Sequence, residues 1–137
     1  MYPEEICKPM REELVSAGFE ELKTAEDVNN KFNSNCETLL VFVNSVCGCA
    51  AGSARPGVIL STKNSKKPKE LLTVFAGQDK EATIKVREYM APYPPSSPCI
   101  ALFKSGELVH FIERHQIEGS LKELIAENLI KAYNQYC

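Results

Sequence analysis

The stretch TLLVFVNSVCGCAAGSARPG, residues 38–57, decides the fold, because an apolar run passes directly into two closely spaced cysteines and then into small residues. Residues 38–44 are apolar and rich in strand-forming side chains, which is typical of a central strand covered on both faces. Residues 49–60 are short-chained and apolar, as in a helix packed closely on a sheet, and Pro56 is expected to kink that helix. The stretch therefore predicts a buried strand that leads to a pair of thiols at the start of a helix.

Outside this stretch, helices and strands alternate along the chain. Periodicity predicts helices at residues 3–17, 24–32, 79–90 and 118–133, and strands at residues 71–76, 99–103 and 108–112. Thr24 and Asp27 form an N-cap pair, and Gly106 marks a hairpin between the last two strands. The apolar residues at helical spacing in the first and last helices are Ile6, Met10, Leu14, Val15, Leu121, Leu124, Ile125, Leu129 and Ile130. We expect one domain over residues 1–137, a three-layer α/β sandwich with a mixed central sheet and helices on both faces.

Composition and charge narrow the classes of function. With 44% hydrophobic and 25% charged residues, the chain has the composition of an ordinary soluble globular protein. A net charge of -2 gives no general attraction to phosphate backbones, so nucleic acid is not an expected partner. The opening MYPEEICKPM lacks the features of a signal peptide, and no apolar run approaches the roughly 18 residues of a membrane span. We expect a cytoplasmic protein without a membrane partner.

The thiols of Cys47 and Cys49 are the candidate chemical centre. Active sites of α/β sheets lie at the carboxyl ends of strands, and Cys47 follows such an end. The first turn of a helix stabilises thiolate over thiol, so Cys47 is expected to be the nucleophile and Cys49 the thiol that resolves its mixed disulfide. Gly48 is expected to permit the tight ring of a Cys47–Cys49 disulfide. Strain in that ring favours isomerisation and the removal of mixed disulfides.

Two alternatives to redox catalysis by Cys47 and Cys49 stay open: metal binding, and a plain structural role for the two cysteines. Thiolates also bind zinc or copper, but a closed zinc site needs about four ligands and the sequence has no second close pair. His110 and His115 are distant in sequence, although folding could bring one of them, with Cys99, near the thiols. A non-enzymatic metal-binding or redox-sensing module is therefore the alternative function. The cysteines expected to be structural or idle are Cys7, Cys36, Cys99 and Cys137.

Three segments of the chain are together similar to the bacilliredoxin family, which consists of thioredoxin-like proteins with a CxC motif. They are VNSVCGCAAGSARPG at residues 43–57, YPPSSPCIALFKSGELVHFI at residues 93–112 and ERHQIEG at residues 113–119. The resemblance implies a thioredoxin-like sandwich in which Pro98 is a cis-proline packed against the thiol pair. It also implies that the backbone of Ser97 pairs with the substrate chain.

The same resemblance implies a thiol–disulfide oxidoreductase that removes bacillithiol from S-bacillithiolated cytosolic proteins. Bacillithiol would be a co-substrate, with no tightly bound cofactor and no metal. Compared with ordinary thioredoxins, Val41 stands where a buried acid lies six residues before the first cysteine, and the chain has no tryptophan. Cys49 then lacks an internal base. Resolution is therefore expected to be slow, and Cys47 could act as a monothiol with an external thiol completing the cycle.

Three basic residues are further candidates. The resemblance to thioredoxin-like proteins implies that Arg114 and His115 face the CGC motif, where a cation lowers the pKa of Cys47 or binds a carboxylate of the small thiol. A solvated pair at a helix entrance is the alternative for both. Arg55, one turn into the helix after the thiols, is expected to add positive potential or to form a surface salt bridge.

Overall fold

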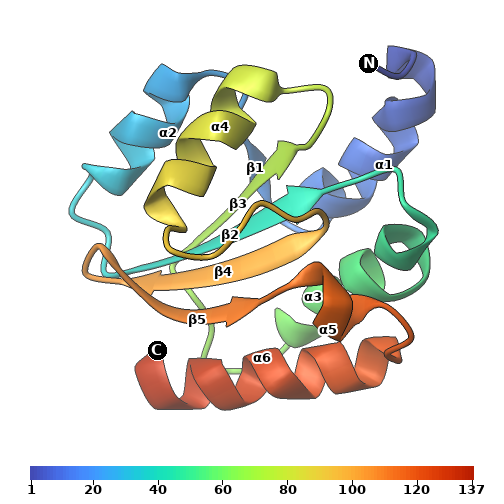
Figure 1. Cartoon of the computed structure of the whole chain (residues 1–137). Helices are drawn as coiled ribbons and strands as arrows, with labels where there is room; N and C mark the ends of the chain where they lie inside the picture. Colours follow the sequence, from blue (N-terminus) through green and yellow to red (C-terminus); the bar gives the residue numbers. More distant parts are fainter.

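The computed structural model describes residues 1–137 and shows a five-stranded mixed sheet between two layers of helices (Figure 1). The strands are β1 (Glu20–Glu21), β2 (Thr38–Asn44), β3 (Glu70–Phe75), β4 (Cys99–Lys104) and β5 (Glu107–Ile112). The helices are α1 (Glu4–Ser16), α2 (Ala25–Phe32), α3 (Arg55–Ser61), α4 (Lys80–Tyr89), α5 (Arg114–Ile117) and α6 (Lys122–Tyr136), with a π-helical segment η1 (Ala50–Ala54) before α3. The predicted α/β sandwich with a mixed sheet is confirmed. None of the helices has the length and apolar character needed to cross a membrane.

Strand β2 is the centre of the sheet, whose order is β1-β3-β2-β4-β5. It runs parallel to β3 and antiparallel to β4, and all of its residues are buried. Leu40 and Phe42 point into the core that α1, α3 and α6 cover, whereas Leu39, Val41 and Val43 point into the core under α2 and α4. Because successive strand residues face opposite sides, the continuous apolar run is explained by helices on both faces (Figure 1).

The helix after the thiols differs from the regular helix predicted for residues 49–60. Its first turns are the wide π-helical segment η1, and α3 begins only at Arg55. Pro56 has no N–H to donate to the carbonyl of Gly52, and its ring crowds that group. The N–H of Arg55 instead reaches back to the carbonyl of Ala50, which widens the turn. The helix is therefore irregular in the turns before Pro56, rather than kinked at Pro56 as expected.

The last predicted helix was wrong in its boundaries. The chain forms the short helix α5, leaves the helical region at Glu118 and Gly119, and starts α6 only after Leu121. Leu121 and Leu124 consequently lie on the solvent side, with 65% and 55% of their surface exposed, although Ile125 is buried as expected. The two-residue strand β1 was not predicted, because two glutamates carry no strand signal.

Helix α1 buries only part of its predicted apolar face. Ile6 and Val15 are about half exposed, at 49% and 47%, whereas Cys7, Arg11 and Leu14 are buried. The buried face of α1 also carries Arg11 and its charged network, which the hydrophobic spacing did not reveal.

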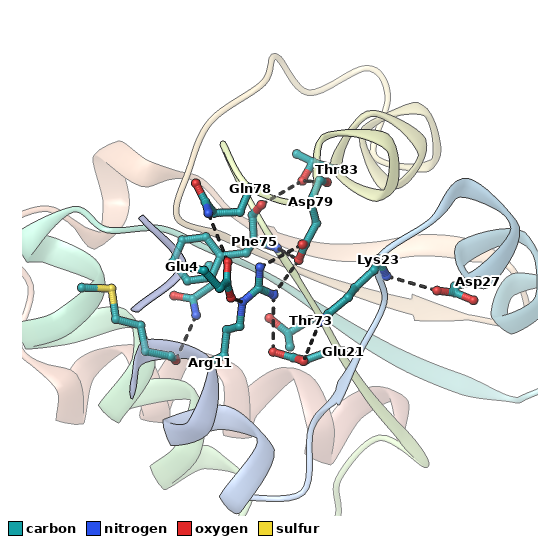
Figure 2. A network of polar contacts seen from close by, with 12 residues as sticks. Glu4, Arg11, Glu21, Lys23, Asp27, Thr73, Phe75, Gln78, Asp79 and Thr83 are labelled. Atoms are coloured by element: carbon teal, nitrogen blue, oxygen red, sulfur yellow. Dashed lines mark hydrogen bonds and ion pairs between the residues drawn. The ribbon is translucent and has the colours of Figure 1, made fainter. Parts of the chain in front are cut away.

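Figure 2 shows this network, in which the Arg11 guanidinium lies among three carboxylates. It donates to both oxygens of Asp79, at 2.8 and 2.9 Å, and to Glu4 at 2.7 Å, with Glu21 at 3.4 Å. Asp79 also accepts the backbone N–H of Phe75, over whose ring the guanidinium lies, 5.1 Å from the centroid. The network therefore joins α1 to the carboxyl end of β3 and the start of α4.

Replacing Arg11 by methionine is expected to lower the free energy of unfolding by about 3–5 kcal/mol, because it leaves the Asp79 carboxylate buried without its cation. Urea denaturation followed by circular dichroism measures this loss. The double variant Arg11→Met with Asp79→Asn should recover part of it, since no uncompensated charge then remains. A loss of less than about 1 kcal/mol in the single variant would contradict the structural role of the pair.

Candidate active site

The loop between β2 and η1 carries the thiols, and the buried side chain of Arg55 holds it in place. Arg55 is 1% exposed and donates from Nη1 to Asn44 Oδ1 and to the carbonyl of Ser45, both at 2.9 Å. The N–H of Ser45 donates to Asn44 Oδ1 at 2.8 Å, and the N–H of Cys47 donates to Ser45 Oγ at 3.1 Å. Arg55 does pair with Glu13, at 3.1 Å, but as a buried residue that orders the backbone before Cys47. Of the two roles expected for Arg55, the surface salt bridge was wrong, and a contribution of positive potential stays a prediction.

Cys47 and Cys49 are both free thiols, and their sulfurs lie 2.7 Å apart. The hydrogen bond with the Cys49 thiol lowers the pKa of Cys47 below its ordinary value of 9.0. The backbone N–H of Cys49, 3.4 Å from Cys47 Sγ, and the positive charge of Arg114 act in the same direction against desolvation by burial. Burial, reinforced by the neighbouring thiolate, raises the pKa of Cys49. Cys47 therefore ionises first, with Cys49 as its hydrogen-bond donor.

Arg114 lies directly beside this pair, although it comes from α5 on the other side of the hairpin. Its Nη2 donates to Cys47 Sγ at 3.2 Å and its Nη1 to the carbonyl of Ser97, also at 3.2 Å, while Nε forms an ion pair with Glu118 at 2.6 Å. His115 does not join the site: its side chain is 75% exposed and pairs with Glu113 at 2.9 Å. One member of the predicted cationic pair thus faces the thiols and the other faces solvent.

The remaining predicted site residues are Ser97, Pro98 and Gly48. The Ser97–Pro98 peptide bond is cis, and Ser97 lines a groove of about 480 Å³ together with Cys47 and Arg114. Gly48 is exposed, has no atom within 4 Å of the place where a Cβ would lie, and does not adopt a positive φ. With the thiols reduced, the fold has no need of glycine there. Its role in the disulfide ring stays a prediction.

None of the other cysteines lines the groove beside Cys47. Cys99 is 1% exposed at the start of β4, and burial raises its pKa to about 12, so it remains protonated near neutral pH. Cys7 is buried, Cys36 is partly buried and Cys137 is exposed. No group of three or more histidine, cysteine or acidic side chains is arranged to hold a metal ion.

Sequence reasoning missed Asn44 and Ser45, which order the backbone before Cys47, and Arg87, which lines the groove beside it. A polar residue closing an otherwise apolar strand was the available signal for Asn44. Arg87 lines the groove from α4. No local pattern marked it, because its position depends on how α4 packs against the loop that precedes Pro98.

Comparisons with known proteins bear on this site. A family model described as disulphide isomerase matches residues 2–137. A bacilliredoxin of Cytophaga hutchinsonii is 56% identical over 135 residues, which cover 98% of this chain and 99% of the relative. A bacilliredoxin of Halalkalibacterium halodurans is 54% identical over 136 residues, which cover 99% of this chain and 94% of the relative.

Solved structures share the fold at low sequence identity. The thioredoxin of Fasciola hepatica matches with a TM-score of 0.57 and 13% identity, and the match covers 87% of this chain and 100% of that protein. The reduced thioredoxin of Schistosoma mansoni matches with a TM-score of 0.55 and 19% identity, covering 82% of this chain and 95% of that one. The thioredoxin fold, the thiol pair and the curated relatives together define a thiol–disulfide oxidoreductase. Within that class, the chain belongs to the bacilliredoxin family, which confirms the resemblance seen in the three sequence segments.

Replacing Arg114 by glutamine is expected to raise the pKa of Cys47, because it removes a positive charge and a donor from the thiolate. The rate of iodoacetamide alkylation at Cys47, followed against pH, should then reach its midpoint at a higher pH than in the parent protein. Arg114→Lys, which keeps the charge, should shift the midpoint less. An identical profile for all three proteins would show that Arg114 does not stabilise the thiolate.

Proposed function

We propose that this protein reduces mixed disulfides between protein cysteines and a low-molecular-weight thiol. The observation that supports this most directly is the position of the Cys47 sulfur, which lies beside the Cys49 thiol and accepts a hydrogen bond from Arg114 Nη2 at 3.2 Å. These surroundings lower the pKa of Cys47, whereas burial raises the pKa of Cys49. Cys47 is therefore the nucleophile, and Cys49 stays protonated until it attacks the mixed disulfide on Cys47. The curated bacilliredoxin relatives favour bacillithiol as the small thiol and S-bacillithiolated cytosolic proteins as the clients.

In the first step, the Cys47 thiolate attacks the small-thiol sulfur of the mixed disulfide. A bond forms between these two sulfurs while the bond to the client sulfur breaks, and the client leaves as a thiolate with that electron pair. Arg114 donates to the attacking sulfur, and the Cys49 thiol lies against it. Once Cys47 is ionised, the Cys49 S–H is the donor of this contact, so both residues stabilise the thiolate that starts the reaction. The client is reduced, and the small thiol remains on Cys47.

The second step releases the small thiol by one of two routes. Either Cys49 loses its proton and attacks Cys47 Sγ, which forms the intramolecular disulfide and expels the small thiol as a thiolate, or the thiolate of a second low-molecular-weight thiol attacks the sulfur of the bound small thiol. The second route produces a disulfide of the two small thiols and returns Cys47 as a thiolate. Burial raises the pKa of Cys49, and the residue six positions before Cys47 is the buried Val41, which offers no base. The first route is therefore slow near neutral pH. In that route, a thiol reductant must also reopen the disulfide.

Disulfide isomerisation would use the same first step on a disulfide within one client protein. Attack by Cys47 would leave the client tethered through one sulfur, and a second client thiol would then displace Cys47. The description of the matching family supports this additional activity.

The direct test is mass spectrometry of the protein after it is mixed with a model client that carries bacillithiol on one cysteine. The Cys49→Ser variant should accumulate the small thiol on Cys47, and the Cys47→Ser variant should leave the client modified. If the client keeps its bacillithiol with the parent protein as well as with both variants, the proposal is contradicted. Recovery of the purified protein with stoichiometric zinc or copper on the two cysteines would favour the metal-binding alternative instead.

Resolution by Cys49 is expected to accelerate as the pH rises above neutral. Because the pKa of Cys49 is raised from 9.0, its thiolate is scarce at pH 7 and grows with pH until that pKa is passed. Stopped-flow measurement of small-thiol release from the Cys47 adduct gives this rate. A rate that is independent of pH between about 7 and 9 would show that deprotonation of Cys49 does not limit the step.

A further inference from the structure

The groove beside Cys47 carries a second arginine that the proposed reaction has not yet used. Its lining residues are Tyr2, Ser45, Val46, Cys47, Ala76, Gly77, Arg87, Ser97 and Arg114. Two of these residues are cationic and none is acidic, so the space next to the nucleophile favours negative charge. A volume of about 480 Å³ falls within the range of sites that hold small molecules.

The two guanidiniums hold successive peptide units of one loop. Arg87 Nη2 donates to the carbonyl of Ser96 at 3.3 Å, and Arg114 Nη1 donates to the carbonyl of Ser97 at 3.2 Å. Pro98 follows directly. Both arginines are therefore anchored to the segment before the cis peptide bond, and this segment lies against Cys47 across the groove.

Arg87 differs from Arg114 in having no carboxylate partner. Arg114 forms an ion pair with Glu118, whereas the contact with Ser96 is the only hydrogen bond that the side chain of Arg87 makes. Its Nε is buried without any partner. A partly buried guanidinium with an unpaired charge is costly in free energy, and a bound anion reduces that cost. Guanidinium also matches carboxylate geometry through paired N–H donors.

We propose that Arg87, together with Arg114, forms a subsite for a carboxylate of the small thiol that Cys47 removes. This inference rests on the proposed function, and it defines the substrate class: low-molecular-weight thiols that carry negative charge. The small thiol is the source of the carboxylate, because its sulfur becomes bonded to Cys47 and its remaining atoms must then lie within a few bonds of the groove. The subsite positions the small-thiol sulfur, rather than the client sulfur, for attack.

The experiment compares mixed disulfides that differ only in the small thiol. One model client with a single exposed cysteine is loaded either with mercaptosuccinate, which carries two carboxylates, or with neutral mercaptoethanol. The rate constant for release of the client thiol is measured for each. The parent protein should react faster with the mercaptosuccinate adduct, and the ratio of the two rates should fall about tenfold in Arg87→Gln, which corresponds to about 1.4 kcal/mol.

Lys85→Gln is the matched control, because Lys85 lies two residues earlier on α4, faces another direction and pairs with Glu88. It should keep the parent ratio. Arg87→Lys should keep part of the preference, since it retains the charge but loses the paired donors. If Arg87→Gln does not fold, two other measurements replace it. The ratio of the two rates should be lower in Arg87→Lys than in the parent protein, and the parent ratio should fall at high salt.

The outcomes separate the subsite from the function it serves. A ratio near one in the parent protein, or an unchanged ratio in the folded Arg87 variants, overturns the subsite. If the two arginines bound carboxylates of the client instead, the two adducts would react at the same rate, because the client is the same in both. That result also overturns the subsite. No release from either adduct would instead contradict the proposed function itself.

Discussion

The contact between two sulfurs 2.7 Å apart is the interaction on which the chemistry of this protein depends. A thiol that donates to its neighbour makes that neighbour easier to ionise, and the neighbouring thiolate in turn makes the donor harder to ionise. Burial widens the difference in pKa between the two thiols. It is the largest of the effects on Cys49, and it raises the pKa of that residue. A spacing of one residue thus gives two chemically identical side chains opposite roles.

The rest of the fold keeps this contact in place from several sides. Below it, Arg55 holds the end of β2 and the backbone before Cys47 through Asn44 and Ser45. Beside it, Arg114 reaches from α5 to the thiolate and to the loop before Pro98. Further along the same edge of the sheet, the Arg11 network joins α1 to β3 and α4 (Figure 2). Arg55 and Arg11, two charged side chains with partners inside the protein, therefore help to position the reacting end of the sheet.

Much of the fold was predictable because it depends on local patterns. The run at residues 38–44 gave the central strand, and the Thr24–Asp27 capping box and the hairpin turn at Gly106 were found where their residue types indicated. The placement of Arg114 beside Cys47 came from resemblance alone. Arg87 and the burial of Arg55 could not be predicted in this way, because each depends on which polar atoms distant segments bring together. The exposure of Leu121 likewise followed from a helix boundary that the apolar spacing concealed.

The most direct measurement is a titration of the individual cysteines by NMR, using carbon-labelled cysteine in the parent protein and in Cys49→Ala. The account predicts that Cys47 ionises below the ordinary value of 9.0 and Cys49 above it in the parent protein. Removal of the Cys49 thiol should then move the pKa of Cys47 upward. Two cysteines that titrate together near 9.0, or a pKa of Cys47 that is unchanged in Cys49→Ala, would contradict it.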